Sequence, residues 1–378
     1  MKKSNQSKET VSVHGGVKHD SAGVVNPVEP STAFRYIDEE VQPYPRYSNT
    51  PNQKFIIEKV RVLENAESGL IFSSGMAAIS TTLFSILRRG DHIVLQRSLY
   101  GGTHSLVVEE FENAGISFAF ASCDAQSLIE SIQSNTKVIY IETPSNPLLE
   151  IVDLAGVAEK ARSRGVMTVV DNTFASPINQ NPIRHGIDVV IHSGTKYLGG
   201  HSDLCFGVVV GTDAIVECIR MKAVLHGGSV NAHTCSLIER SLKTLAIRVQ
   251  RQNENAVQIA DFLQEHPGIE DVYYPGLFSH PGHETARRQM SGFGGMLSFR
   301  LIPDISPRDF LQKLELITPA MSLGGVESTA TIPAYTSHKA MTAAERTKLG
   351  ISEQLVRLSV GIEAGMDLIQ DLEQALDK

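Results

Sequence analysis

Two consecutive apolar segments of this sequence lead into residues that could bind a cationic ring carrying an aldehyde. Val166–Val170 runs directly into Asp171, and Val189–Ile191 is followed shortly by Lys196. Ligands of an open parallel sheet bind beyond the carboxyl ends of its strands, so both side chains are expected at one edge. A partly desolvated lysine loses its proton more easily and becomes a Schiff-base nucleophile. A buried carboxylate can pair with a protonated ring nitrogen.

Pyridoxal phosphate (PLP) is a cofactor that requires such a lysine and such a carboxylate. The lysine holds its aldehyde, and the carboxylate keeps the pyridinium protonated so that the ring can accept carbanion electrons. Its phosphate needs a third element, which the sequence offers at Ser73-Ser74-Gly75-Met76, directly before a helix expected to begin near Ala77. The N–H groups of Gly75 and Met76 at such a helix start would point towards an anion. Together these features predict a PLP site.

Other kinds of site fit the sequence poorly. Gly194-Thr195-Lys196 lacks both the upstream glycine and the following Ser or Thr of a Walker loop, and no GxGxxG segment follows the first strand. The 13 histidines show no HExxH or other metal-ligand spacing, so we interpret them as surface or structural residues. No metal site is predicted.

The elements that must position these residues alternate between strands and helices from about residue 50 to residue 210. Continuous apolar runs are typical of strands covered on both faces, and they occur at His92–Leu95, Phe118–Ala121, Val138–Ile141, Val166–Val170, Val189–Ile191 and Phe206–Val210. Helical periodicity lies before or between them, at Lys54–Leu63, Ala77–Leu87, His104–Asn113, Ala125–Gln133 and Leu154–Arg162. We expect an α/β fold with a doubly wound, mainly parallel sheet.

The pattern changes on both sides of this region. After about residue 248 come a helix, three strands and a last helix, which predict a smaller α+β domain: Val249–Gln264, Asp271–Tyr274, Gly295–Leu301, Leu355–Gly361 and Met366–Leu376. The first fifty residues contain four prolines and little periodicity, so we expect an extended arm that contacts a neighbouring subunit. The predicted domains are an arm at 1–50, a large PLP-binding domain at 51–247 and a C-terminal domain at 248–378.

Length, charge and cysteine content disfavour several classes of protein. The chain has 378 residues, more than one core usually serves, which fits two domains. A formal net charge of −8 without long blocks of one sign disfavours a nucleic-acid groove. No run approaches the roughly 18 apolar residues that span a bilayer, and the start does not have the pattern of a secretory signal. Four cysteines without paired spacing favour a reducing cytoplasm.

Eight motifs occur along the chain: Tyr44-Pro45-Arg46-Tyr47-Ser48-Asn49, Ser74-Gly75-Met76, Leu99-Tyr100-Gly101-Gly102-Thr103, Glu142-Thr143-Pro144-Ser145-Asn146-Pro147, Asp171-Asn172-Thr173, Ser193-Gly194-Thr195-Lys196-Tyr197, Ser322-Leu323-Gly324-Gly325 and Val356-Arg357-Leu358-Ser359-Val360-Gly361. In this order, and over almost the whole chain, they resemble the Cys/Met-metabolism family of PLP enzymes. That family contains cystathionine γ-synthase, cystathionine γ- and β-lyases, methionine γ-lyase and homoserine-ester sulfhydrylases.

The resemblance implies a role for each residue around the cofactor ring. Lys196 should form the Schiff base with PLP and move the proton from the substrate Cα. Asp171 should pair with the pyridinium nitrogen, and Asn146 should hydrogen-bond the phenolic oxygen. Tyr100 should lie against the ring face and serve as an acid or base near the leaving group.

The resemblance also implies which groups bind the phosphate and the substrate carboxylate. The phosphate should be held by Gly75, Met76, Ser193 and Thr195, joined by Tyr44 and Arg46 from a neighbouring subunit. Arg357 should bind the α-carboxylate of an amino acid through a bidentate pair, with Ser322 and Asn146 nearby.

The implied fold is the type I PLP-dependent transferase fold, similar to that of aspartate aminotransferase, in a homotetramer whose active sites are shared between two subunits. The implied reaction is elimination or replacement at Cγ, or at Cβ, of a sulfur amino acid or homoserine ester. Cystathionine γ-lyase is the activity we favour. Methionine γ-lyase, cystathionine γ-synthase and cystathionine β-lyase remain alternatives, and a PLP-binding protein without turnover is a remote one.

Three departures from the family pattern bear on the substrate. Many relatives that handle cystathionine carry a glutamate just before the Ser-Leu-Gly-Gly motif, where this chain has Met321. Methionine γ-lyases typically carry a cysteine in the loop after the stacking tyrosine, where this chain has Gly102. The usual Asn-Pro-Thr after the arm motif is replaced by Asn49-Thr50-Pro51-Asn52.

Overall fold

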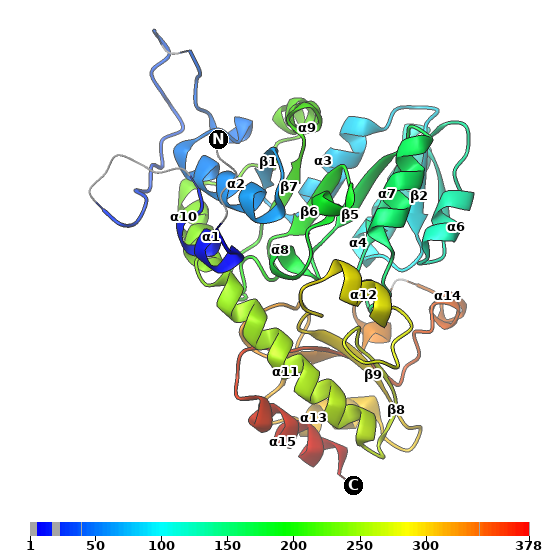
Figure 1. Ribbon diagram of the computed structural model, residues 1–378. Helices are drawn as coiled ribbons and strands as arrows, with labels where there is room; N and C mark the ends of the chain where they lie inside the picture. Colours follow the sequence, from blue (N-terminus) through cyan, green and yellow to red (C-terminus); the bar gives the residue numbers. More distant parts are fainter. Residues whose placement is uncertain (1–5, 17–22, 39, 340, 378) are drawn as a thin grey trace.

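The structure is a computed structural model that describes residues 6–16, 23–38, 40–339 and 341–377. A larger α/β part contains a seven-stranded sheet, and a smaller part below it in Figure 1 contains a five-stranded sheet. In spatial order the larger sheet consists of β1 (Ser68–Phe72), β7 (Gly207–Gly211), β6 (Val189–Ser193), β5 (Met167–Asp171), β4 (Thr136–Glu142), β2 (His92–Gln96) and β3 (Ser117–Ala121).

The strands from β6 to β3 are parallel, whereas β7 pairs antiparallel with both β6 and β1. The residues between β6 and β7 form turns and loop without a crossover helix, the element that usually joins parallel neighbours. The prediction of a mainly parallel, doubly wound sheet is confirmed.

Helices cover both faces of this sheet, which explains why its strands are apolar without alternation. One face packs its core against α2 (Pro51–Glu64), α6 (Ala125–Glu130), α7 (Leu154–Ser163) and α10 (Ala232–Leu242). The other face packs against α3 (Gly75–Ile86) and α9 (Asp213–His226). Alternate residues of one strand therefore enter two separate cores, as Val189 and Val190 of β6 do.

One predicted helix is interrupted. The segment expected as a single helix over His104–Asn113 consists of α4 (Gly101–Leu106), a π-helical turn at Val107–Phe111 and α5 (Glu112–Ala114). The π turn directs Val107 and Phe111 into the core, where both are fully buried. The sequence analysis also left α9 and α10 unassigned.

The chain enters the smaller part through helix α11 (Leu245–Glu265) (Figure 1). This helix runs across the domain boundary that was expected between residues 247 and 248. Its sheet has the order β10 (Thr318–Pro319), β11 (Thr329–Thr331), β12 (Leu355–Ser359), β9 (Met296–Leu301) and β8 (Ile269–Tyr273). The helices of this part are α12 (His283–Gln289), α13 (Pro307–Lys313), α14 (Ala343–Lys348) and α15 (Gly365–Leu376).

The first fifty residues are not extended throughout. Helix α1 (Lys8–His14) packs against α2 and α11 of the same chain and buries Val11. The described residues from Gly23 to Tyr44 form no helix or strand and project from the body at the upper left of Figure 1. They end in a 3-10 turn at Pro45–Tyr47.

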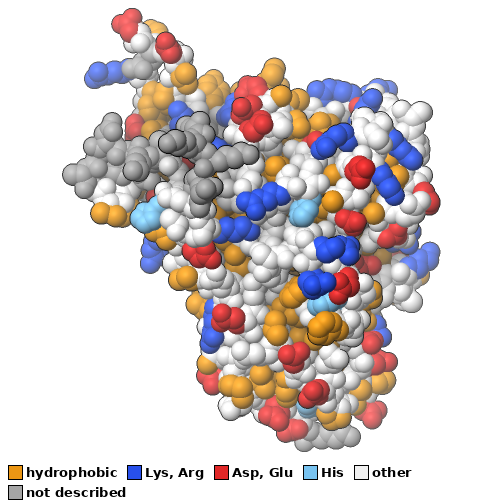
Figure 2. All heavy atoms as spheres, in the orientation of Figure 1, with side chains coloured by type: hydrophobic (Ala, Val, Ile, Leu, Met, Phe, Trp, Pro, Cys, Tyr) orange, Lys and Arg blue, Asp and Glu red, His pale blue; other side chains and the backbone are white. Residues whose placement is uncertain are grey.

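Side chains of both charges are interspersed on the face shown in Figure 2, and apolar side chains gather where the arm leaves the body. Several arm residues expose large fractions of their apolar side chains, among them Val24, Val25, Tyr36 and Ile37. Among the described helices, none is long and apolar enough to cross a bilayer.

Candidate active site

Lys196 lies in the loop after β6 and is close to the smaller part of the chain. Its Nζ donates a hydrogen bond to Ser322 Oγ at 2.9 Å. Burial, and secondarily the positive charge of Arg357, lowers the pKa of the Lys196 ammonium to about 8. A fraction of the amine is therefore unprotonated near neutral pH, as a nucleophile for an aldehyde requires.

Asp171 is the last residue of β5 and is buried, with 5% of its surface exposed. Its Oδ1 accepts the Thr173 N–H at 3.0 Å, and its Oδ2 accepts the Tyr140 hydroxyl at 3.4 Å. Burial raises the pKa of this carboxyl, while the hydrogen bonds from Thr173 and then the charge of His192 act in the opposite direction. A cationic ring nitrogen in contact with Asp171 would supply the missing counter-charge.

The start of α3 lies against the end of β6 and forms an anion cradle. Ser74 caps the helix by accepting the Ala77 N–H, which leaves the first N–H groups, those of Gly75 and Met76, without intrahelical acceptors. A Cβ on Gly75 would lie 2.8 Å from Ser193 Oγ, so only glycine allows the helix start to approach the Ser193 hydroxyl this closely. The Ser193 hydroxyl thus lies beside a helix N-terminus, a donor set that fits the phosphate of PLP, and Thr195 follows two residues later in the same loop.

Tyr100 precedes α4 and exposes 46% of its surface. Its backbone N–H donates to Glu142 Oε2 at 2.8 Å, which fixes the start of the loop. A Cβ at Gly102 would lie 2.6 Å from the Tyr100 ring and 3.0 Å from Met76 Sδ. Any larger residue at position 102 therefore requires the Tyr100 ring to move.

Arg357 joins the two parts of the chain. It lies on β12, is buried, and donates from Nη1 to Asn146 Oδ1 at 2.8 Å and from Nη2 to the Ser322 carbonyl at 3.3 Å. Burial lowers the pKa of the guanidinium to about 10. Because a guanidinium has five N–H donors, the group retains donors for a carboxylate after these two contacts.

The contacts that the structure shows for Tyr44 and Arg46 are with residues other than these groups. Arg46 Nη1 donates to the Val224 carbonyl of α9 at 2.8 Å, and the guanidinium lies 5.5 Å from the centre of the Tyr44 ring. Within one chain the structure therefore links Lys196, Ser322, Asn146 and Arg357 by direct contacts, whereas Arg46 contacts α9 and Tyr44 lies beside Arg46.

Two buried groups near the site had no role in the sequence analysis. Glu142 ends β4 in register with Asp171, and burial, followed by the charge of Asp171, raises its pKa well above the usual range. His338 is buried, and burial, followed by the charge of Arg357, lowers its pKa to about 4. Glu142 could have been found in the sequence, because it is a polar residue at the end of a predicted strand. His338 lies in a loop, and no sequence pattern indicated that it would be near the site.

A model of the family described as "Cys/Met metabolism PLP-dependent enzyme" matches residues 9–377 of this chain. The chain belongs to this family. It is 43% identical to a cystathionine β-lyase of Coxiella burnetii, over 97% of both chains. It is 41% identical to a cystathionine γ-lyase of Bacillus subtilis, over 98% of this chain and 99% of the relative.

Among solved structures, the chain resembles a cystathionine γ-lyase from Lactobacillus plantarum complexed with L-serine. The TM-score is 0.95 and the identity 38%, with 98% of each chain covered. The predicted family, its α/β fold and its PLP cofactor are thereby confirmed.

Proposed function

We propose that this enzyme is a cystathionine γ-lyase, which cleaves the C–S bond at Cγ of cystathionine. The observation that carries the proposal is the contact between the carboxylate-binding candidate Arg357 and Asn146, next to the bond between Lys196 and Ser322. A guanidinium, an amide and a partly unprotonated amine are thus grouped as an α-amino acid requires: one group holds its carboxylate while another removes a proton from Cα.

PLP supplies the electron sink that makes Cα and then Cβ acidic. Lys196 is the proposed holder of the cofactor aldehyde and the base at Cα, because its amine is partly buried and has a pKa close to neutral pH. Asp171 is the proposed partner of the ring nitrogen, and Asn146 of the phenolic oxygen. Tyr100 is exposed next to the phosphate-binding helix start, so we assign its hydroxyl to proton transfer near the leaving sulfur.

The phosphate is proposed to bind Gly75, Met76, Ser193 and Thr195. Tyr44 and Arg46 are proposed to complete the site of a neighbouring subunit, because both lie at the end of the projecting arm, where Arg46 contacts α9 and the Tyr44 ring lies beside the Arg46 guanidinium. A homotetramer with shared sites follows from this assignment. The four cysteines are unpaired, which supports the cytoplasm as the proposed location.

Cystathionine β-lyase and methionine γ-lyase are the principal alternatives, and cystathionine γ-synthase a further one. The relative at 43% identity carries the β-lyase name, which keeps the choice between Cβ and Cγ open to experiment. The packing of Gly102 against Tyr100 and Met76 disfavours the cysteine-bearing loop typical of methionine γ-lyases.

The test is to identify the 2-oxo acid released by the PLP-loaded protein from L-cystathionine, with L-methionine in parallel. Release of 2-oxobutyrate from cystathionine establishes γ-elimination, whereas pyruvate establishes the β-lyase reaction and refutes the proposal. Turnover of methionine alone refutes it as well. Lys196→Ala should lose both turnover and the visible absorption of bound PLP, while Lys160→Ala on the exposed side of α7 should retain both. A fully active Lys196→Ala protein would refute the assignment of the lysine.

A further inference from the structure

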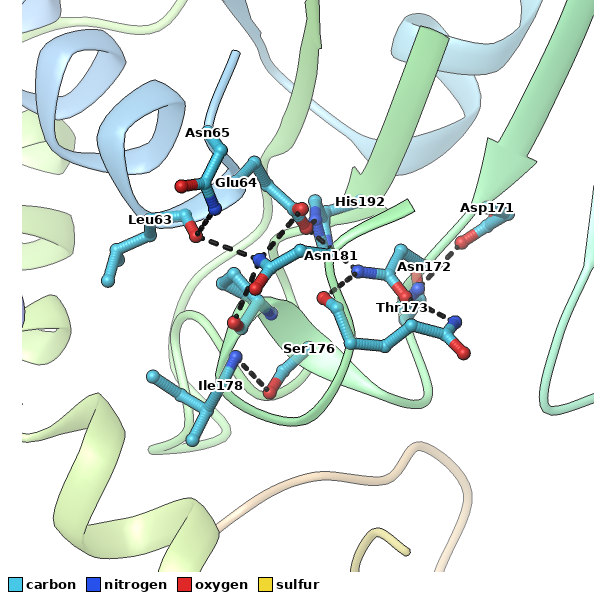
Figure 3. A network of polar contacts seen from close by, with 12 residues as sticks. Leu63, Glu64, Asn65, Asp171, Asn172, Thr173, Ser176, Ile178, Asn181 and His192 are labelled. Atoms are coloured by element: carbon cyan, nitrogen blue, oxygen red, sulfur yellow. Dashed lines mark hydrogen bonds and ion pairs between the residues drawn. The ribbon is translucent and has the colours of Figure 1, made fainter. Parts of the chain in front are cut away.

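A buried polar network lies behind Asp171, on the opposite face of the large sheet (Figure 3). Asp171 pairs in register with Ile191, so the next residues, Asn172 and His192, direct their side chains away from the cofactor face. There they meet Glu64, the last residue of α2. None of these three side chains was assigned a role above.

Glu64 is the centre of this network. Its Oε1 accepts hydrogen bonds from His192 Nε2 at 2.6 Å and from Asn172 Nδ2 at 2.8 Å, and its Oε2 accepts one from Asn181 Nδ2 at 3.2 Å. Glu64, His192 and Asn172 expose at most 1% of their surfaces. Because a carboxylate only accepts, Nε2 of His192 must carry a proton.

A carboxylate buried this completely is costly unless it is paired. Here three N–H donors are in direct contact with it, and the contact from His192 is the shortest at 2.6 Å. Lys8 of α1 has both Glu64 and Arg184, of the turn at Pro182–His185, as charged neighbours, and it donates to the Ile178 carbonyl rather than to Glu64. On the cofactor face, Asp171, Glu142 and the Tyr140 hydroxyl lie close together.

We infer that Glu64 and His192 are positioning residues for the cofactor. From behind the sheet they fix the ends of β5 and β6. They also hold an imidazole that carries a proton on Nε2 near Asp171, so that the aspartate is ionised when it meets the pyridinium nitrogen. The inference rests on the assignment of Asp171 under Proposed function. Its second basis is that the strand ends are connected: the Asn172 N–H donates to the Ile191 carbonyl at 2.9 Å, and the Ser193 N–H to Thr173 Oγ1 at 2.8 Å.

The network can act on Asp171 through charge because His192 favours its ionised form, against the burial that raises its pKa. Loss of the imidazole, or of the Glu64 carboxylate that accepts its Nε2–H and holds it in place, should therefore raise the pKa of Asp171. One pKa unit corresponds to about a tenfold change in the ionised fraction on the acid side. PLP affinity should fall by about this factor at low pH and recover as the pH rises.

The experiment measures the dissociation constant of PLP for the apoprotein from pH 6 to 9 in Glu64→Gln, His192→Gln and the double variant. Glu239→Gln is the matched control, because Glu239 is a carboxylate of α10 that is 7% exposed and bonds to Lys243 and Asn26. Asp171→Asn is the reference for loss of the aspartate itself. Thermal unfolding of each apoprotein reports folding separately from cofactor binding.

We expect each single variant to weaken PLP binding about tenfold at pH 6 and less at pH 9. The double variant should bind PLP no more weakly than the single variant with the lower affinity, because the two residues act together. Glu239→Gln should bind PLP as the wild type does. Wild-type PLP affinity in Glu64→Gln and His192→Gln, with affinity lost in Asp171→Asn, overturns the inference and leaves the assignment of Asp171 intact. Retained affinity in Asp171→Asn overturns both. A loss of PLP affinity that is equal at every pH also overturns the inference, and failure of both single variants to fold does so by assigning the pair to stability alone.

Discussion

Replacing Arg357 by lysine should impair substrate binding while preserving the positive charge. The guanidinium is buried and donates to Asn146 Oδ1 and to the Ser322 carbonyl, so its plane is fixed while its other N–H donors remain available. A lysine ammonium is a point donor and cannot present two parallel N–H groups to a carboxylate. The substitution therefore removes at least one charge-assisted hydrogen bond from the bound amino acid.

The size of the effect follows from the value of that bond. A hydrogen bond to a charged group contributes about 1.5 to 3 kcal/mol, and each 1.4 kcal/mol changes a binding constant about tenfold. We expect the KM for cystathionine to rise roughly 10- to 150-fold. The effect on kcat should be smaller, because Lys196 and Tyr100 remain in place.

Steady-state kinetics of the PLP-loaded enzyme is the assay, with Arg300→Lys as the matched control. Arg300 lies on the neighbouring strand β9, donates to the Tyr273 hydroxyl at 2.6 Å and pairs with Asp271 at the surface. Its replacement should leave KM unchanged. A KM within threefold of the wild type for Arg357→Lys, or an equal rise for Arg300→Lys, would contradict the reasoning.

Four further outcomes follow from the structure. Because the pKa of Lys196 is lowered to about 8, the rate at which PLP attaches to the apoenzyme should rise with pH up to about 8 and level off above it; a stopped-flow rate that still climbs between pH 9 and 10 would contradict the lowered pKa. Tyr100→Phe keeps the ring and should bind PLP normally while kcat falls about 100-fold, so an unchanged kcat would remove the hydroxyl from the mechanism. Met321 is 66% exposed, so in Met321→Glu a partly screened ion pair with the distal ammonium should lower the KM for cystathionine by up to about fivefold without changing that for methionine; equal effects on both substrates would exclude such a contact. A Cβ on Gly207 would clash with the Ser74 carbonyl, so Gly207→Ala should lower the free energy of unfolding by about 1 to 3 kcal/mol in urea, and unchanged stability would show that the loop before α3 yields freely.

Local sequence patterns were sufficient to predict six of the seven strands of the large sheet and two of its strand-end residues. Val166–Val170 and Val189–Ile191 are apolar without alternation, and this pattern is typical of strands that are covered on both faces. Since parallel strands end at a common edge, the positions of Asp171 and Lys196 followed from the same pattern. The π turn at Val107–Phe111 did not follow, because a helix with one extra residue in a turn has nearly the same apolar periodicity as a regular one.

The proposed roles of Arg357 and Ser322 came from the resemblance to the family rather than from spacing. Nothing near either residue in the sequence indicates a partner, because Arg357 and Asn146 are separated by 211 positions. Their contact exists because α11 carries the chain away from the large sheet and β12 returns it, so that the smaller part lies against the loop after β4.

The sequence by itself thus determined the chemistry available to this protein: a strand-end lysine, a strand-end aspartate and a helix start suited to phosphate. Only the tertiary structure decided the electrostatic surroundings of these groups. Glu64, Glu142 and His192 look like ordinary polar residues in the sequence, but the fold buries all three, raises the pKa of Glu142 through that burial and brings Glu64 and His192 into direct contact. The physical reason is that burial and pairing are set by segments distant along the chain, whereas strand and helix patterns are set by residues only two to four positions apart.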